Sequence, residues 1–292
     1  MSDSERAPLS VAIIGAGEMG AAVGLRMRKT GARVITTLKG RSAASIDRAS
    51  SAGLEAIDDD DALVRQADFI LSIVPPHAAL ATAERFRAPL TDAQRKPVFV
   101  ECNAISPATL RRIADSLDST GCTFIDAGII GGPPPAARLD KGPRFYASGA
   151  DAHLMTRLRS YGLDVAIIDG PVGAASALKM SYAGLTKGLI ALGTAMIGAA
   201  TRDGLAAELR AELKRSQPEV LAWLGPKVPG MFHKAHRWVA EMEEIAEFID
   251  GTGRGSEIYT GIARLYERIA ADRENEGDNA QSLAALSRFF GQ

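Results

Sequence analysis

Two patterns in the sequence predict an α/β domain followed by an all-α domain. Up to Pro171, apolar strand-like runs alternate with helix-like segments, as in a parallel sheet covered by helices. From Gly173 onward almost every segment has helical spacing. We therefore expect a loose tail over residues 1–8, an α/β domain over residues 9–172 and a helical domain over residues 173–292.

The composition is that of an ordinary globular protein. The chain has 292 residues, of which 46% are hydrophobic and 24% are charged, so each domain can bury a core. A net charge of −1 gives no electrostatic reason to expect nucleic acid or a membrane surface as a partner. The N-terminus is polar, and no uninterrupted apolar run has the roughly 18 residues of a membrane span. Cys102 and Cys122 fall in or beside predicted strands, which favours a reducing cytoplasm.

The segment from Val11 to Met27, VAIIGAGEMGAAVGLRM, indicates a strand, a tight glycine turn and a helix. In such a turn the first glycine allows the bend, the second lets the backbone approach a diphosphate, and the third lets helix and strand pack closely. A diphosphate at the helix N-terminus would meet unpaired N–H groups and a favourable dipole. We therefore predict a Rossmann-type domain whose cofactor contacts include Gly15, Gly17, Glu18, Met19 and Gly20.

The end of the second predicted strand, Arg33–Leu38, indicates which dinucleotide binds. An enzyme selective for NAD places an acidic residue here to hold the ribose 2′-hydroxyl, whereas residues 36–42 contain no acid. Lys39, Arg41 and Ser42 would suit a 2′-phosphate, with Thr37 as an alternative hydroxyl. We therefore expect NADP rather than NAD; the alternative is that both cations are solvated loop charges.

Two further strands, over residues 68–74 and 98–103, end in polar or proline-containing segments. Ligands of open α/β sheets bind at the carboxyl ends of the strands, so Val74, Pro75 and Asn103 are candidate cofactor contacts. Asn103 would lie near the nicotinamide ribose, or it is a turn residue. The acidic run over residues 58–61 is explained by a favourable helix dipole, without a metal.

The next strand, Cys122–Ala127, leads to a segment in which Gly131 and Gly132 precede three prolines. Adjacent glycines allow backbone N–H groups to face a ligand, so both are candidate substrate contacts. Two more strands are expected over residues 145–148 and 165–168, with a helix between them. A long, apolar central helix is predicted over residues 173–200. Later helices are expected at residues 204–216, 218–224, 232–250, 256–271 and 281–290.

Lys179 is the best candidate for a group that moves a proton. It lies early in the long helix among Ala175, Leu178 and Met180, where loss of solvent would lower a lysine pKa. Tyr182 and Lys187 follow on the same helix and are candidate substrate contacts. The structural alternative for Lys179 is a side chain that extends to solvent.

The ordered motifs VAIIGAGEMG, SIVPP, CNAISP, DAGIIGG and GPVGAASALKMSYAG resemble those of the β-hydroxyacid dehydrogenases, within the 6-phosphogluconate dehydrogenase-like superfamily. The resemblance runs from about residue 10 to residue 190. It implies a Rossmann-type domain, a helical domain that makes much of a homodimer interface, and a substrate cleft. It also implies that the lysine six residues after Gly173, which is Lys179, is the proton donor or acceptor.

This chain departs from the family pattern at two positions. Many members have a serine before the double glycine, where this chain has Ile130, and many have an asparagine where it has Ala183. Both differences argue against a small β-hydroxy acid such as hydroxyisobutyrate. The C-terminal half resembles a poorly characterised branch with its own helical domain, so the reaction type is carried over but the substrate is not.

The helical segment Met231–Glu244 is rich in polar and aromatic side chains. His236, together with His233 and Arg237, could supply charge for an acidic substrate. The alternative is an amphipathic interface helix that buries Trp238 and Met242. The two histidines lack a third ligand at suitable spacing, and we expect no metal.

These features predict an NADP-dependent oxidoreductase that interconverts an alcohol and a carbonyl on a small polar molecule, which we expect to carry a carboxylate. The first alternative is an imine reductase of the same architecture, in which Tyr182 would donate a proton. The second is a non-catalytic NADP-binding sensor, which would leave Lys179 without a role.

Overall fold

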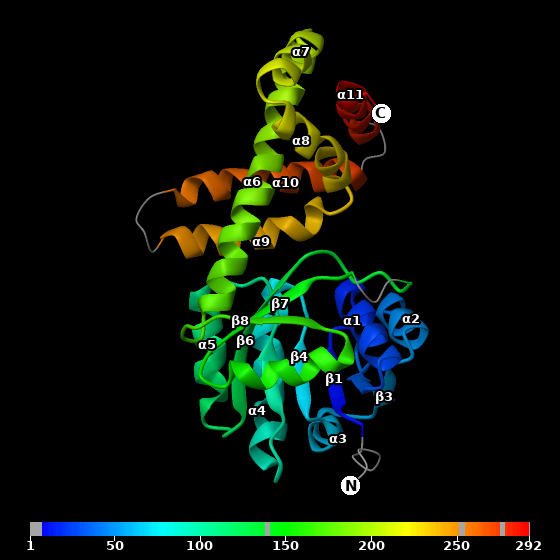
Figure 1. The fold of residues 1–292 in the computed structure, drawn as a ribbon, viewed down its shortest axis with the longest axis vertical. Coiled ribbons are helices and arrows are strands. Elements are labelled where there is room, and N and C mark those ends of the chain that lie inside the picture. The colour runs from blue at the N-terminus through cyan, green and yellow to red at the C-terminus, as the bar shows by residue number, and fades with distance from the viewer. Residues whose placement is uncertain (1–7, 138–140, 251–254, 275–277, 292) are drawn as a thin grey trace. The chain divides into compact units, whose positions relative to one another are not determined.

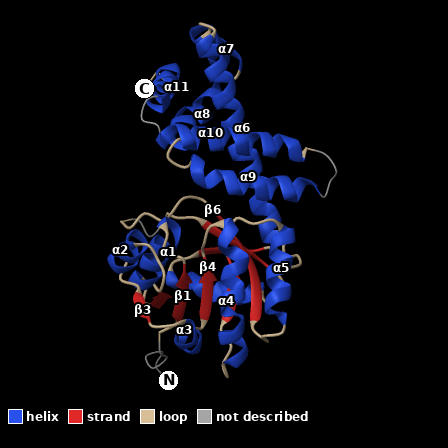
Figure 2. Ribbon diagram, turned by 180° about the vertical axis from the view of Figure 1, so that it is seen from behind, coloured by secondary structure: helices blue, strands red, loops and turns tan. Residues whose placement is uncertain are grey.

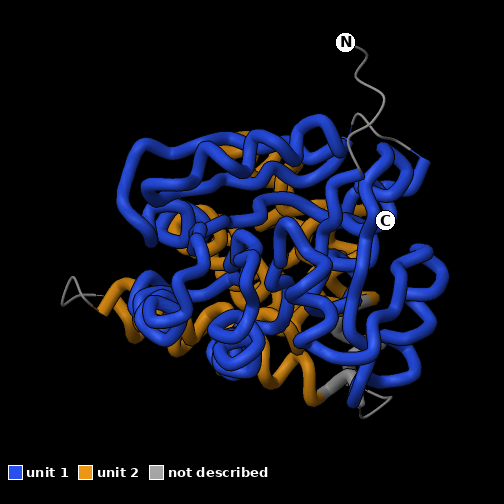
Figure 3. The backbone as a smooth tube through the Cα atoms, turned by 90° about the horizontal axis from the view of Figure 1, so that it is seen from below, with its two compact units in different colours: residues 1–179 blue, residues 180–292 orange. Residues whose placement is uncertain are grey.

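A computed structural model describes residues 8–137, 141–250, 255–274 and 278–291, and the chain divides into two compact units. Unit 1 comprises residues 1–179 and unit 2 residues 180–292 (Figure 3). The predicted loose tail lies almost wholly outside the described residues. The predicted boundary between residues 172 and 173 lies just before the helix that runs from one unit into the other, and it stays a prediction.

Unit 1 is built on one eight-stranded sheet in the order β3-β2-β1-β4-β5-β6-β7-β8 (Figure 1). The strands are β1 (Ser10–Ile14), β2 (Arg33–Thr37), β3 (Glu55–Ile57), β4 (Phe69–Ser72), β5 (Val98–Glu101), β6 (Thr123–Ile130), β7 (Arg144–Ser148) and β8 (Asp164–Ile167). Neighbouring strands are parallel except β6 and β7, which are antiparallel. The carboxyl ends of β1 to β6 therefore lie along one edge of the sheet, where a nucleotide is expected.

Helices cover both faces of this sheet (Figure 2). They are α1 (Glu18–Lys29), α2 (Ala43–Ser51), α3 (Asp60–Gln66), α4 (Ala79–Asp92) and α5 (Pro107–Asp118), with 3-10 helices η1 (Pro76–Ala78) and η2 (Ala152–Tyr161). One apolar core packs α1, α2 and η2 on one face, and a second packs α3, α4 and α5 on the other. The central strands are apolar almost throughout because both of their faces are buried.

The sequence patterns miss β3 and shorten β6. β3 has only three residues, two of them exposed, so it lacks the apolar run that marks a strand. β6 continues through Gly128 to Ile130, because β7 pairs with it over that length. The segment expected to be a helix between β7 and β8 is the 3-10 helix η2.

Unit 2 is entirely helical in its described part. Helix α6 (Ala174–Arg202) begins in unit 1, and the others are α7 (Ala206–Ser216), α8 (Pro218–Met231), α9 (Ala235–Asp250), α10 (Ser256–Glu274) and α11 (Asp278–Phe290). Helices α9 and α10 pack side by side (Figure 1). The predicted end at Leu224 is too early, since α8 continues through Pro226 and Pro229. The order of an α/β domain followed by an all-α domain confirms the predicted fold class.

Helix α6 is long and apolar enough to cross a membrane by length and composition alone. An 18-residue window has a mean hydropathy of 1.4, and 39% of it is buried. Lys179 and Lys187 interrupt this helix, so it contains no uninterrupted apolar run of about 18 residues, as the sequence indicates. Such a helix is weak evidence for a membrane, because the central helix of a soluble protein has the same composition.

Candidate functional site

The glycine turn after β1 has the backbone that the sequence predicts for a diphosphate. Gly15 has a φ of +99°, and a Cβ there would lie 2.2 Å from the carbonyl oxygen of Ile73. A Cβ at Gly20 would lie 2.1 Å from the carbonyl oxygen of Gly15. A Cβ at Gly17 would meet nothing within 4 Å. Gly15 and Gly20 are thus required by the protein's own packing, whereas Gly17 leaves open space for a ligand.

Helix α1 begins at Glu18, directly after Gly17, and its N-cap makes no side-chain hydrogen bond. Glu18 and Met19 therefore lie in a first turn whose N–H groups can face an anion, as phosphate sites at helix N-termini require. Arg48 of α2 supports the turn, since its Nε donates to the carbonyl oxygen of Ala16 at 3.1 Å. The residues present fit a dinucleotide diphosphate. Arg48 is a contact that sequence spacing does not reveal.

The segment after β2 carries the predicted 2′-phosphate residues. Lys39 is exposed, Arg41 is half-buried, and Ser42 caps α2 by accepting the N–H of Ser45 at 3.4 Å. Ser42 would therefore have two roles: it caps α2, and it is a predicted contact of the 2′-phosphate. The alternative hydroxyl, that of Thr37, donates instead to Asp60 Oδ1 at 3.2 Å.

Folding also brings two charged residues to this corner that the linear sequence does not place there. Arg85 of α4 pairs with Asp60 at 3.0 Å, and it lies close enough to Arg41 for their charges to repel. Burial lowers the pKa of Arg85, the charge of Asp60 opposes that shift, and the charge of Arg41 adds to it. An acid thus reaches the end of β2 from α3, although its charge is balanced by Arg85.

The carboxyl ends of β4 and β5 are joined by Asn103. Its Oδ1 accepts the N–H of Val74 at 2.6 Å, and its Nδ2 donates to Ser72 Oγ at 3.1 Å. Asn103 is 4% exposed, so both ends of its amide are used inside the protein. The side chain fixes the backbone at Val74 and Pro75, which makes it a support of this edge of the sheet. Its contact with a cofactor stays a prediction.

Four neighbouring strands carry a row of buried polar residues. Ser72, Glu101, Asp126 and Ser148 are consecutive register partners across β4, β5, β6 and β7, and each is at most 1% exposed. Glu101 Oε1 accepts the N–H of Asn103 at 3.0 Å, and Oε2 has no hydrogen-bond partner among the described residues. Burial raises the pKa of Glu101 to about 8, against the opposing effect of its hydrogen bonds with Asn103 and Ser72.

Lys179 lies close to the end of β6. Its Nζ donates a hydrogen bond to the carbonyl oxygen of Ile129, and its side chain is half-buried. Gly128 makes this approach possible, because a Cβ there would lie 2.8 Å from the carbonyl oxygen of Ala175 and 3.1 Å from the Cβ of Lys179. The sequence singles out the two glycines further on and misses Gly128, whose role depends on α6.

Gly131 and Gly132 follow directly after β6 and are both exposed. Gly131 has a φ of +125°, and a Cβ there would lie 2.9 Å from the Cα of Pro143. Its lack of a side chain is therefore needed for the turn beside β7. Gly132 has open space around it, as a backbone contact with a substrate would require.

The predicted substrate residues of unit 2 lie in different environments. Tyr182 is 50% exposed and His236 is exposed. Lys187 pairs with Glu241, and its Nζ lies 5.0 Å from the centre of the Trp238 ring. Burial lowers the pKa of Lys187, and Glu241 opposes the shift. This ion pair gives Lys187 a structural role within unit 2, and a substrate role for it stays a prediction.

Comparisons with known proteins agree with this geometry. The family described as the NAD binding domain of 6-phosphogluconate dehydrogenase matches residues 10–161, and a domain of unknown function (DUF1932) matches residues 200–269. An uncharacterised 28.5 kDa protein of Methanothermus fervidus is 29% identical over 242 residues, covering 82% of this chain and 91% of that protein.

Solved structures show the same fold. A conserved protein of unknown function, described as structurally similar to 3-hydroxyacid dehydrogenases, is 28% identical with a TM-score of 0.68 and covers 91% of this chain and 98% of its own. The 3-hydroxyisobutyrate dehydrogenase of Mycobacterium tuberculosis is 18% identical with a TM-score of 0.73, covering 97% and 99%. An imine reductase from Myxococcus stipitatus is 18% identical with a TM-score of 0.61, covering 97% and 99%.

The nucleotide-binding turn, the order of the strands and the match over more than half of the chain lead to one family. Its fold is shared with 3-hydroxyisobutyrate dehydrogenase, and the family match confirms the resemblance noted in the sequence. The chain belongs to the family described as the NAD binding domain of 6-phosphogluconate dehydrogenase, and it has the fold of the hydroxyacid dehydrogenases.

Proposed function

We propose that the protein is an NADP-dependent oxidoreductase that interconverts an alcohol and a carbonyl on a small, carboxylate-bearing molecule. The observation that carries this proposal is the placement of Lys179 beside β6, the strand that ends at the predicted substrate glycines. A half-buried amine at the ligand edge of a nucleotide-binding sheet is suited to proton transfer.

The bound cofactor would supply the hydride-transfer chemistry. The turn from Gly15 to Gly20 and the first turn of α1 would hold its diphosphate. Lys39, Arg41 and Ser42 would hold a 2′-phosphate, because a guanidinium and an ammonium can both neutralise it. Val74, Pro75 and Asn103 would complete the cofactor contacts.

Lys179 would move the proton of the reacting oxygen. The carbonyl oxygen of Ile129 accepts one N–H of the Nζ group and so orients the amine. In reduction, the ammonium donates a proton to the oxygen of the substrate carbonyl; in oxidation, the neutral amine takes the proton of the hydroxyl. Gly131 and Gly132 would present backbone N–H groups to the substrate, and Tyr182, Lys187 and His236 remain proposed contacts from unit 2.

The variant Lys179→Met tests the role of the lysine. Methionine keeps an unbranched chain of similar length but cannot transfer a proton, so turnover should fall at least 10³-fold. The dissociation constant for NADPH, measured by fluorescence titration, should change less than threefold because the glycine turn is untouched. A variant that kept most of the wild-type rate would show that another group moves the proton.

A second candidate is an imine reductase, in which Tyr182 donates the proton. The specific observation in its favour is that this phenol is 50% exposed and lies three residues after Lys179 on α6. An ammonium at Lys179 argues against it, since a protonated imine would be repelled. Assays of NADPH consumption with cyclic imines and with keto acids separate the two, and no turnover on either panel would support a non-catalytic sensor.

We also propose that the protein is a homodimer formed through α6. Within unit 2 this helix exposes five large apolar side chains: Tyr182, Leu185, Leu189, Leu192 and Met196. Their spacing alternates between three and four residues, as in the seam between two packed helices. Each of the five is at least 50% exposed. We call this set the α6 stripe.

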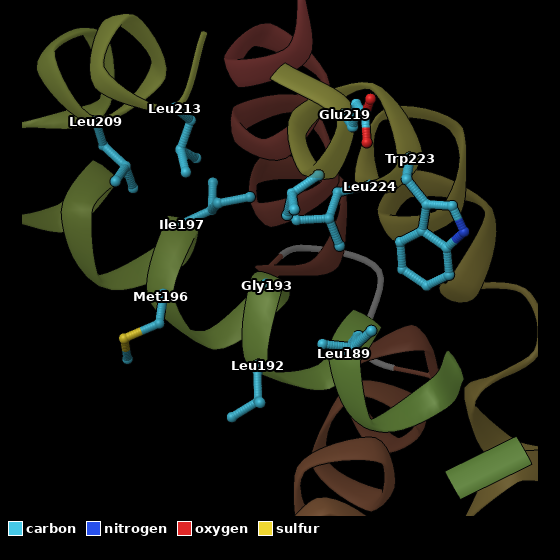
Figure 4. Close-up of a pocket in the computed structure, with 11 residues that line it drawn as sticks. Leu189, Leu192, Gly193, Met196, Ile197, Leu209, Leu213, Glu219, Trp223 and Leu224 are labelled. Atoms are coloured by element: carbon cyan, nitrogen blue, oxygen red, sulfur yellow. The ribbon is translucent and has the colours of Figure 1, made fainter. Parts of the chain in front are cut away.

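The α6 stripe borders an apolar cavity of about 540 Å³ between α6, α7 and α8 (Figure 4). Figure 4 shows Leu189, Leu192 and Met196 on α6, with Leu209 and Leu213 on α7 and Trp223 and Leu224 on α8. The stripe alone exposes on the order of 500 Å², and a stable interface buries about 800 Å² per partner. The stripe alone therefore supplies more than half of that area, and its regular spacing allows it to pack against the same stripe of a second copy of the chain.

A cytoplasmic location remains part of the proposal. It is supported by two cysteines that are both free in the fold, Cys102 and Cys122, because free thiols are typical of a reducing compartment.

A further inference from the structure

Asp126 of β6 holds the N-terminus of α6. Its Oδ2 accepts the backbone N–H groups of Gly173, Ala175 and Ser176 at 2.9, 3.0 and 3.1 Å. Its Oδ1 accepts the hydroxyl of Ser176 at 2.6 Å. Asp126 itself is 0% exposed. One buried carboxylate therefore satisfies most of the N–H groups that the first turn of a helix leaves without partners.

Ser148 of β7 completes this contact. Its hydroxyl donates to Asp126 Oδ2 at 2.8 Å and accepts the N–H of Ala175 at 3.0 Å. A buried carboxylate needs several donors to offset its loss of water. The donors here come from β7 and from α6, so the helix cannot turn or slide without leaving the carboxylate short of partners.

The same strand makes a second contact with α6 three residues later. The carbonyl oxygen of Ile129 accepts the hydrogen bond from Lys179 Nζ, and Gly128 lets the helix approach. Asp126 and Ile129 are about 10 Å apart along the strand, and the capped end of α6 and Lys179 are about 7.5 Å apart along the helix. Two attachment points along the helix limit both the rotation and the sliding of the first turns of α6 relative to β6.

We propose that Asp126 is the positioning residue of Lys179: by holding the first turn of α6 to β6, it sets the place of the amine and puts a buried negative charge at the start of the same helix. This inference rests on the proposed role of Lys179 in proton transfer. Asp126 does not touch the substrate. It acts through α6, and its charge favours the ammonium form of the lysine.

The variant Asp126→Asn removes the charge and keeps one acceptor oxygen. The test measures how fast Lys179 is acetylated as a function of pH, with mass spectrometry of the peptide that contains it. Loss of a buried negative charge about 10 Å away disfavours the ammonium, so the midpoint pH of labelling should fall by about one pH unit. In the same variant kcat should fall at least tenfold, while the KM for NADPH should change less than threefold.

Ser176→Ala is the matched control. It removes one hydrogen bond to Asp126 but leaves the carboxylate charge in place. Its melting temperature should fall, and the midpoint of labelling should move by less than about 0.3 pH unit. Glu101→Gln is a second control in the same row of residues: Glu101 lies in register with Asp126, and its raised pKa keeps it largely neutral at pH 7.

Gly128→Ala keeps the proposal testable if Asp126→Asn does not fold. The added Cβ would lie 2.8 Å from the carbonyl oxygen of Ala175, so α6 must move away from β6. We expect kcat to fall at least tenfold with NADPH affinity unchanged.

A loss of thermal stability in Asp126→Asn with no shift of the labelling midpoint would overturn the proposal and leave Asp126 as a helix cap only. For Gly128→Ala, an unchanged kcat would overturn it. The labelling result does not depend on whether Lys179 is catalytic, so it is independent of the Lys179→Met assay.

Discussion

The two units of this protein depart from the usual distribution of polar and apolar residues in opposite ways. Unit 1 buries polar groups: Glu101 and Asp126 lie side by side in the centre of the sheet, at most 1% exposed. Unit 2 exposes apolar groups, with Leu185 at 67% and Met196 at 61% exposure. Burying a carboxyl group and exposing leucine side chains to water are both unfavourable for the stability of a single folded chain.

The difference indicates two kinds of function. Ser72 and Glu101 are the last residues of β4 and β5, near the edge where ligands of such sheets bind. Asp126 lies inside β6 and is satisfied by α6. The exposed side chains of unit 2 follow one face of a helix at the spacing of an interface. In the function that we propose, unit 1 organises the chemistry and unit 2 presents a surface for a second copy of the chain. The charged pair in unit 2, Lys187 with Glu241, is half-buried and joins α6 to α9 within the unit.

The largest expected effect is on assembly. Leu192→Glu places a charge in the middle of the α6 stripe, and two such charges would have to be buried in a symmetric dimer. By light scattering at micromolar concentration, we expect the variant to be a monomer and the wild type to be a dimer. Ile258→Glu is the control, because Ile258 is 60% exposed on α10, outside the stripe. If the wild type is also a monomer, the proposal that unit 2 presents a dimer interface is wrong.

A smaller effect is expected from the buried Glu101. Burial raises its pKa from the ordinary value of 4.5, which holds in the unfolded chain, to about 8 in the folded protein. Below pH 4.5 both states hold the proton and the associated stability is fully present. As the pH rises to 8, the unfolded chain releases the proton first, so the free energy of unfolding falls by roughly 4 kcal/mol.

Glu101→Gln removes this titration. Urea unfolding at several pH values should show that the variant becomes more stable relative to the wild type as the pH rises from 5 to 8. Parallel curves for the two proteins would mean that Glu101 is ionised in the folded state.

The smallest effect concerns the cofactor. Arg41→Gln should weaken NADPH binding by about 10- to 100-fold, because one charge-assisted contact to the 2′-phosphate contributes about 1.5–3 kcal/mol. NADH binding should be almost unchanged, since NADH has no such phosphate. Fluorescence titration with both cofactors measures the difference, and equal weakening of both would assign Arg41 to the common part of the dinucleotide.

The sequence predicted the fold class because its signals are local. The glycine turn after β1, the apolar runs of β4 and β5 and the helical spacing after Gly173 each depend on residues near one another in the chain. It missed β3, which is short and largely exposed. It ended α8 early because proline inside a helix usually breaks it, whereas α8 continues through Pro226 and Pro229.

The candidate site was predicted only in part. Lys179 and the glycines have recognisable spacing, so their positions could be named from the sequence. Arg48, Arg85, Asp126 and Gly128 could not, since each acts on an element far away in the chain. The sequence placed Lys187 and Lys179 on one helix, which is α6. It did not reveal that Lys187 forms an ion pair with Glu241.

By itself, the sequence determined where the diphosphate turn, the parallel strands and the long helix lie, because steric limits on glycine and the periods of apolar residues act over a few positions. Only the tertiary structure decided which polar groups meet inside the sheet and which apolar groups stay outside the helical unit. Those outcomes depend on contacts between residues such as Asp126 and Ser176, 50 positions apart in the chain, and no local pattern contains them.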